Sequence, residues 1–206
     1  MVVIIDYEMG NLKSVSNAFN HLGIENKISD DEDDIKSADA LILPGVGAFP
    51  DAMETINKKG IDVIIKEEAV KGKMILGICL GMQLLFEKSY EKVEKEGLGL
   101  LKGRIVKMID DKEHNIKIPH IGWNSLAYNR KHKIIDGVDE GSFVYFVHSY
   151  CAAGYDSGDL IAYSEYGENK IPGIVAHKNV IGIQFHPEKS GECGLKMLKN
   201  FGEMIK

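Results

Sequence analysis

The sequence has few cysteines, the residues that form disulfides and many zinc sites. Its three cysteines, Cys79, Cys151 and Cys193, are far apart, odd in number and include no C-x-x-C pair. This pattern argues against a disulfide framework, a zinc site and a redox dithiol. The contiguous carboxylates of residues 30–34 lack the alternating ligand spacing of calcium loops, and we expect a solvated helix start there. We therefore expect no metal and no cofactor.

Long apolar runs and clusters of basic residues are also missing. No stretch reaches the roughly 18 apolar residues of a membrane span, and residues 1–6 lack the basic lead of a signal peptide. The net charge of -6 argues against nucleic-acid binding, which needs clustered Lys and Arg. We expect a soluble, cytoplasmic protein with no membrane or nucleic-acid partner, which binds a small molecule or a protein.

The apolar residues that are present predict an α/β fold. With 206 residues and 44% hydrophobic side chains, the chain can form one domain over residues 1–206. A first helix over residues 12–22 follows the first apolar run and stops at Gly23. Apolar runs without alternation are typical of parallel strands that are covered on both faces. Such runs predict strands over residues 2–5, 24–28, 40–43 and 74–78.

The second half of the chain is richer in strands. Short β-type runs separated by Gly, Asn and Asp turns follow Gly103, and they favour antiparallel pairing. They cover residues 104–109, 143–147, 174–176 and 180–185. Apolar spacings of three and four then predict a C-terminal amphipathic helix over residues 195–205. The fold class is therefore a doubly wound, mostly parallel sheet with helices on both faces, plus an antiparallel portion in the C-terminal half.

Cys79 is the candidate nucleophile. It lies in the pattern Gly77-Ile-Cys79-Leu-Gly81, after a buried strand and before a helix predicted over residues 80–86. That context is typical of a nucleophile elbow, whose sharp turn strains the backbone and exposes the side chain. A helix N-terminus also favours the thiolate, the reactive form. The alternative, a small buried apolar residue, is the one we favour for Cys151 and Cys193.

His186 and Glu188 are the candidate base and its orienting carboxylate. Pro187 keeps His186 out of the α region, so we expect an extended segment in which residues 186 and 188 project to the same side. The carboxylate would hold one ring nitrogen as a donor and leave the other to accept the thiol proton. His148 is another candidate base, but no carboxylate stands at matching spacing. We expect His148 to have a structural or substrate-shaping role.

The segment Pro44-Gly45-Val46-Gly47 offers backbone N–H groups for a developing oxyanion. It follows the third predicted strand, and in a parallel sheet its loop shares one edge with the Cys79 turn. An ordinary strand-to-helix turn is the alternative. A phosphate-binding loop is disfavoured because no Lys-Ser/Thr pair follows at the required spacing.

These motifs resemble those of the class I glutamine amidotransferases. The order Cys, His, Glu differs from α/β-hydrolases, where the acid precedes the histidine, and from papain-like enzymes, where the cysteine lies near the N-terminus. Within the class, the chain resembles the glutaminase subunits of imidazole glycerol phosphate synthase over nearly its whole length. The matching segments are Gly10-Asn11 and residues 44–49, 77–83, 119–124, 145–150 and 184–190.

The resemblance implies hydrolysis of L-glutamine to L-glutamate through a γ-glutamyl thioester on Cys79. Ammonia would pass to a (β/α)₈-barrel cyclase in a heterodimer for histidine biosynthesis, forming imidazole glycerol phosphate and AICAR. A barrel of that kind needs about 250 residues, so it is not part of this chain. By the same resemblance, the substrate and oxyanion residues are Gly45, Val46, Gly47, Leu80, Gln83, Ser149 and Tyr150.

The resemblance also places candidate partner contacts at Asn11, Trp123, Asn124 and Lys189. The single tryptophan is the strongest of them, because tryptophan is favoured as an interface anchor. A core position is the alternative for Trp123. Two other functions stay open from the sequence: a stand-alone γ-glutamyl hydrolase or peptidase of the same triad architecture, and a non-enzymatic interaction module. The presence of all three triad residues disfavours the second.

Overall fold

A computed structural model describes residues 1–110 and 116–205. Its centre is an eight-stranded sheet with the order β2-β1-β3-β4-β14-β13-β12-β9. The first five strands in that order are parallel, and β13, β12 and β9 continue the sheet in antiparallel fashion. The strands are β1 Val2–Ile5, β2 Asn26–Ser29, β3 Ala40–Leu43, β4 Met74–Ile78, β9 Ala127–Tyr128, β12 Leu160–Tyr166, β13 Asn169–His177 and β14 Val180–Ile183.

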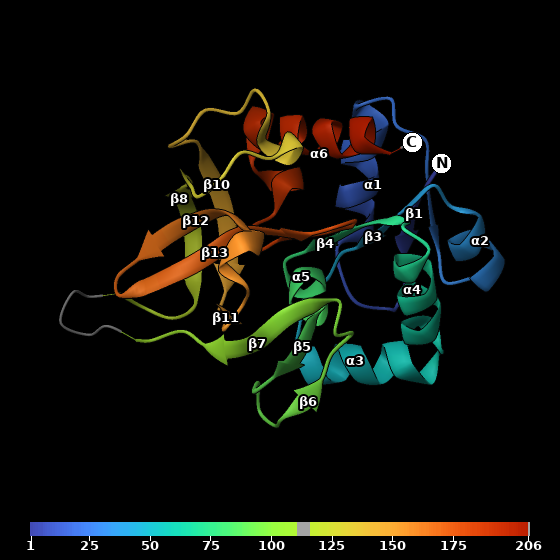
Figure 1. Cartoon of the computed structure of the whole chain (residues 1–206), viewed down its shortest axis with the longest axis horizontal. Coiled ribbons are helices and arrows are strands. Elements are labelled where there is room, and N and C mark those ends of the chain that lie inside the picture. The colour runs from blue at the N-terminus through green and yellow to red at the C-terminus, as the bar shows by residue number, and fades with distance from the viewer. Residues whose placement is uncertain (111–115, 206) are drawn as a thin grey trace.

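Helices cover both faces of this sheet (Figure 1). Val2 and Ile4 of β1 pack with α1 and α6, whereas Val3 and Ile5 pack with the helices of the opposite face. Successive side chains of a strand point to opposite faces, so a continuous apolar run fills both cores. The helices are α1 Leu12–His21, α2 Glu32–Ser37, α3 Phe49–Lys58, α4 Ile61–Val70, α5 Leu80–Leu84 and α6 Gly191–Met204, with 3₁₀ turns η1 Lys133–Ile135, η2 Ser157–Asp159 and η3 Pro187–Lys189.

Two smaller sheets lie beside the central one. A four-stranded sheet has the order β11-β7-β5-β6, and a two-stranded antiparallel sheet pairs β10 with β8. Their strands are β5 Phe86–Ser89, β6 Lys95–Glu96, β7 Leu101–Lys107, β8 His120–Ser125, β10 Phe143–His148 and β11 Tyr150–Ala153. Because β10 leads directly into β11, Ser149 joins the two small sheets near the end of β4.

The predicted fold class is confirmed, and the strands over residues 2–5, 40–43 and 74–78 have the predicted bounds. The acidic run is a helix start, since the Asp31 side chain accepts hydrogen bonds from the backbone at Asp33 and Asp34. Several details were wrong. The runs predicted over residues 104–109, 174–176 and 180–185 are strands over residues 101–107, 169–177 and 180–183, and the C-terminal helix begins at Gly191. The second strand begins at Asn26, and α5 ends at Leu84 because Phe86 already pairs with β7. β14 pairs in parallel with β4, so the C-terminal half is not wholly antiparallel.

Candidate active site

The Cys79 turn joins β4 to α5 and holds the cysteine backbone in a strained conformation. Cys79 has φ 55° and ψ -111°, a region that costs a non-glycine residue about 1–3 kcal/mol. Side chains at the flanking positions would collide with backbone. A Cβ on Gly81 would lie 1.6 Å from the Leu43 oxygen, and one on Gly77 would lie 2.7 Å from the Gly81 oxygen. The sequence therefore folds here only with glycine at both positions.

His186 and Glu188 form a buried pair. The His186 Nδ1 atom lies 2.8 Å from Glu188 Oε1, and the two side chains are 3% and 1% exposed. His186 is extended, as predicted, but Pro187–Lys189 turns into η3. Alternation along an extended segment was thus the wrong reason for the contact. One 3₁₀ turn brings the carboxylate back to the ring instead, and within the described residues His186 Nε2 and Glu188 Oε2 have no hydrogen-bond partner.

Opposing effects set the protonation of His186. Burial disfavours the charged imidazole, but the Cys79 sulfur and the Glu188 carboxylate outweigh burial and raise the pKa of His186 from 6.5 to about 9. The ring therefore carries a proton on both nitrogens near neutral pH. Its Nδ1–H donates to Glu188, which leaves the Nε2 proton available for exchange at the sulfur.

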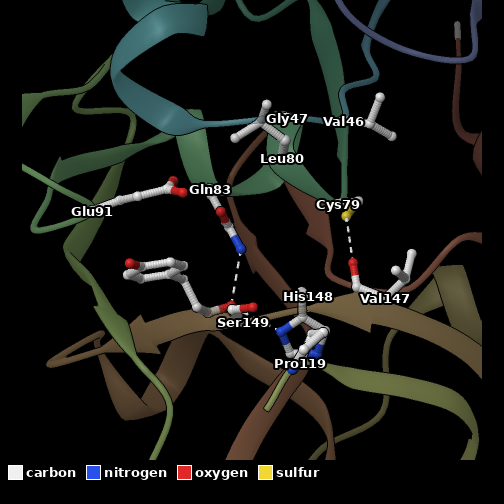
Figure 2. Close-up of a pocket in the computed structure, with 11 residues that line it drawn as sticks. Val46, Gly47, Cys79, Leu80, Gln83, Glu91, Pro119, Val147, His148 and Ser149 are labelled. Carbon is white, nitrogen blue, oxygen red and sulfur yellow. Dashed lines mark hydrogen bonds between the residues drawn. The ribbon is translucent and has the colours of Figure 1, made fainter.

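Cys79 opens onto a cavity of about 280 Å³ (Figure 2). Six of the seven substrate and oxyanion residues expected from the sequence line this cavity, and buried Gly45 lies behind it. The lining residues are Val46, Gly47, Cys79, Leu80, Gln83, Glu91, Pro119, Val147, His148, Ser149 and Tyr150. The cavity is large enough for a small amino-acid side chain and backbone, and its walls come from α5, β10, β11 and the connecting segments around them.

Gln83 is fixed so that its amide oxygen remains free. Its Nε2 donates to the Tyr150 carbonyl at 3.0 Å and to Gln184 Oε1 at 3.1 Å. Both amide hydrogens are thereby used, and Oε1 is left as an acceptor at the cavity. Gln184 is fully buried and its Nε2 lies 3.9 Å from Cys79 Sγ. Gln83 and Gln184 together thus span the base of the cavity from the Tyr150 carbonyl to Cys79.

Glu91 is a cavity residue that the sequence reasoning missed. Its Oε2 accepts a hydrogen bond from the Phe49 backbone at 2.8 Å, which caps the start of α3. Figure 2 shows Glu91 at the end of the cavity away from Cys79, with Gln83 between them. No local motif marks Glu91, because its position depends on how the segment after β5 packs against α3. Only the tertiary structure reveals this carboxylate.

The loop after β3 lies against the Cys79 turn, as its place at the carboxyl edge of the sheet implied. The Tyr7 hydroxyl donates to the Pro44 carbonyl, and the Leu80 N–H points to the Gly45 carbonyl oxygen at 3.4 Å. The loop's own carbonyl thus covers a backbone donor next to Cys79. Beyond it the loop is open, since Val46 is 43% exposed and Gly47 has φ +112°.

Trp123 lies on the surface of the β8–β10 pair, so the alternative of a core position is wrong. It is 55% exposed, and Ile121 and Phe143 on the same side of the pair are 59% and 60% exposed. Residues of the opposite side, such as Val144 and Phe146, are fully buried. We call Ile121, Trp123 and Phe143 the apolar patch. Three large exposed apolar side chains on one strand pair are typical of an interaction site.

The other candidate contacts differ in what their side chains do. Asn11 and Lys189 are exposed, and their elements are neighbours because α1 contacts η3 and η3 contacts β10. Asn11 also caps α1 by accepting from the Ser14 N–H at 3.3 Å. Asn124 is turned inward, where its Nδ2 donates to the Glu165 carbonyl at 2.9 Å. The turn that holds Lys189 therefore contacts the β8–β10 pair directly and α1 contacts that turn, whereas Asn124 ties β8 to β12.

Metal clusters and membrane-spanning helices are both absent from residues 1–110 and 116–205. No group of three or more His, Cys, Asp or Glu side chains there is arranged to hold a metal ion. No helix of the same residues is long and apolar enough to cross a membrane.

Comparison with known proteins identifies the family. The family model for class-I glutamine amidotransferases matches residues 3–204. The chain is 52% identical over 206 residues to the imidazole glycerol phosphate synthase subunit HisH of Caldanaerobacter subterraneus subsp. tengcongensis, covering 100% of this chain and 99% of the relative. It is 55% identical to the HisH subunit of Lactococcus lactis subsp. lactis, covering 99% and 98% of the two chains.

Solved structures share the fold at much lower identity. The structure of PurLQS from Thermotoga maritima superposes with a TM-score of 0.76 at 21% identity, covering 100% of this chain and 98% of that one. A crystal structure of a glutamine amidotransferase gives a TM-score of 0.75 at 20% identity, covering 98% and 100%. The full-length matches show that the chain belongs to the class-I glutamine amidotransferases and, within them, to the HisH subunits of imidazole glycerol phosphate synthase.

Proposed function

We propose that Cys79, His186 and Glu188 carry out the glutamine hydrolysis of this family member and that the ammonia goes to a cyclase partner in histidine biosynthesis. The chain is a glutamine amidotransferase by its family, and the triad is our assignment within it. The observation that carries the assignment is the buried His186–Glu188 pair, whose free Nε2 serves a cysteine held in a strained turn at a cavity. Full-length relatives that are synthase subunits favour this function over a stand-alone γ-glutamyl hydrolase.

The chemistry needs two acyl transfers. The Cys79 sulfur attacks the γ-carbonyl carbon of glutamine, and the Nε2–H of His186 protonates the leaving amide nitrogen, which departs as ammonia. The γ-glutamyl thioester remains on the sulfur. His186 Nε2 then takes a proton from a water that attacks the thioester, and glutamate leaves as the thiolate re-forms. Throughout, Glu188 stays charged and holds the Nδ1–H, which fixes the ring orientation.

The end of the cavity away from Cys79 would bind the amino-acid end of the substrate. The free oxygen of Gln83 and the carboxylate of Glu91 both accept hydrogen bonds, so together they suit the α-ammonium group of glutamine. The Ser149–Tyr150 backbone, which lines the same cavity, would bind the α-carboxylate. Glutamine would then lie with its γ-amide toward Cys79. Glu91 extends the set of substrate residues expected from the sequence.

The oxyanion site is covered in this conformation. The Leu80 N–H that would stabilise the tetrahedral intermediate already points to the Gly45 oxygen. Rotation of the peptide between Gly45 and Val46 would remove that oxygen and present the Val46 N–H in its place. Docking of the partner would favour the rotated state, a gating step of the kind that couples activity to assembly. Full turnover by the isolated chain would contradict this gating.

The docking face for a (β/α)₈-barrel cyclase is the apolar patch with Lys189 and Asn11 beside it. Val147 belongs to the same side of β10 as Phe143 and also lines the cavity. A partner that covers the patch would therefore also close over the route by which ammonia leaves. This continuity between patch and cavity supports a heterodimer in which ammonia passes directly to the cyclase.

A pair of cysteine substitutions tests the nucleophile. In the complex with the cyclase, Cys79→Ala should abolish product formation from glutamine while leaving formation from added ammonia at the wild-type rate. Cys151→Ala is the matched control, since Cys151 is also buried but lies on β11 away from the turn. It should retain both activities. Equal glutamine-dependent rates in wild type and Cys79→Ala would overturn the assignment.

A further inference from the structure

Two buried histidines outside the triad form a chain of hydrogen bonds that ends at the cavity. The His148 Nδ1 atom lies 2.8 Å from the Tyr150 carbonyl oxygen, and its Nε2 lies 3.3 Å from His120 Nδ1. His148 is 7% exposed and His120 is 2% exposed. The Tyr150 oxygen also accepts from Gln83 Nε2 at 3.0 Å, so a single carbonyl receives both side chains.

The contacts determine which nitrogens carry protons. A carbonyl oxygen can only accept, so His148 Nδ1 must be protonated. Burial lowers the pKa of His148 to about 3 and that of His120 to about 4, so both rings are neutral at neutral pH. A neutral His148 with Nδ1–H has a lone pair on Nε2, and His120 must donate to it from Nδ1. Both rings therefore adopt the Nδ1–H tautomer.

Packing fixes the His120 ring in the plane that this bond requires. The ring is stacked between Phe146, with centroids 4.7 Å apart, and Tyr166, with centroids 4.0 Å apart. The Tyr166 hydroxyl in turn donates to the Lys117 carbonyl at 2.9 Å. A ring sandwiched in this way loses little further freedom when it donates. His120 is thus held rigidly, and its hydrogen bond orients His148, which in turn holds the Tyr150 carbonyl.

We propose that His148 and His120 are positioning residues for glutamine, because they hold the Tyr150 carbonyl in the place where it anchors Gln83. The inference rests on the proposed function, since it assigns these residues to the glutamine site of that reaction. Without the His148 donor, the Tyr150 carbonyl keeps only Gln83 as a side-chain partner, and the segment that binds the α end of the substrate loosens. The reacting atoms at Cys79 are not touched. The expected effect is therefore on KM for glutamine and not on kcat.

Steady-state kinetics of the complex with the cyclase and its nucleotide substrate test this split. His148→Leu should raise KM for glutamine about tenfold, which equals about 1.4 kcal/mol, with kcat within about twofold of wild type. His148→Asn places an amide N–H near the Nδ1 position and should recover most of that loss. Asn200→Leu is the matched control, because it also removes a buried side-chain donor, one that bonds the Ile134 and Asp136 carbonyls outside the cavity. Its KM should stay close to that of wild type.

The outcomes separate this inference from the function on which it rests. A wild-type complex that fails to use glutamine refutes both. A working wild type refutes this inference alone if His148→Leu keeps its KM, if its kcat falls instead, or if Asn200→Leu raises KM equally. Nitrogen-15 NMR gives a readout that does not depend on folding of the variants. Signals of the wild-type chain should show Nδ1–H tautomers at both His148 and His120, and an Nε2–H tautomer at His148 would overturn the inference.

Discussion

The substitution Glu188→Gln tests how much of the reactivity depends on the buried carboxylate. Glutamine has nearly the same shape and can still accept the Nδ1–H of His186, but it has no charge. We expect the imidazole to stay near its place while its preference for the protonated form falls. The pKa of His186 should therefore drop below its wild-type value of about 9. Glutamine-dependent kcat/KM should fall as well, by less than in His186→Ala.

The size of the effect follows from the same pKa. The difference between 6.5 and about 9 corresponds to roughly 3 kcal/mol of net preference for the imidazolium. Both the Cys79 sulfur and the Glu188 carboxylate contribute to that preference, so removing the Glu188 charge should remove only part of it, on the order of 1–2 kcal/mol. If the transition state loses that amount, kcat/KM falls about 10- to 100-fold. Full loss of an orienting acid costs up to about 10⁴-fold in other triads, which sets an upper limit.

The pH dependence of stability gives an independent check. A raised pKa in the folded chain adds stability that is fully present below pH 6.5 and is lost as the pH rises through about 9. Glu188→Gln should therefore lower the free energy of unfolding more at pH 6 than at pH 9.5, by about 1 kcal/mol. Denaturant unfolding at the two pH values measures this difference.

The control is Glu192→Gln, which removes an exposed carboxylate from the first turn of α6. It should change neither the rate nor the pH dependence. An unchanged kcat/KM in Glu188→Gln would refute the role of the carboxylate. A loss as large as that of His186→Ala would refute the argument that orientation is retained.

Three further changes have defined outcomes. Gly81→Ala should lower the free energy of unfolding by about 3 kcal/mol or more in denaturant titrations, because its Cβ would lie 1.6 Å from the Leu43 oxygen. The control Gly158→Ala makes only an ordinary van der Waals contact and should leave the free energy of unfolding unchanged. Glu91→Gln should raise KM for glutamine about tenfold with kcat kept, because it removes a charge from the ammonium subsite. Trp123→Ala should raise the calorimetric Kd for the cyclase roughly thirtyfold, and an unchanged Kd would exclude the apolar patch as the docking face.

The sequence predicted the parallel strands of the central sheet well because their composition fits only one kind of element. A parallel strand covered on both faces must be apolar throughout, and residues 40–43 and 74–78 fit no other element of that length. Several strands outside the parallel part of the sheet, β8 among them, were missed for a physical reason. β8 contains both Gly122 and Trp123, and its burial alternates, so its composition resembles a loop until the pairing with β10 is known.

The residues of the candidate site also fall into a group that the sequence predicted and a group that it did not. The Cys79 turn could be predicted because local sterics demand glycine at both flanks, and those demands appear in the sequence. Glu91 and the bond between His120 and His148 could not, because each depends on segments brought together only by tertiary pairing. The β8–β10 register places His120 directly opposite His148 across 28 positions of the chain. No spacing rule within one segment reports such a contact.

The β8–β10 pair links the proposed docking face to the catalytic residues through its two sides. Its outer side carries Trp123, which packs edge-on against Tyr145 with ring centroids 5.9 Å apart. The Tyr145 carbonyl accepts the backbone N–H of His186 at 2.9 Å, and the inner side carries His120 and His148. A partner that shifts this strand pair must therefore act on the base and on the glutamine segment together. On the proposed docking face, partner binding would thus be coupled to catalysis through one two-stranded element, without a long-range pathway through the core.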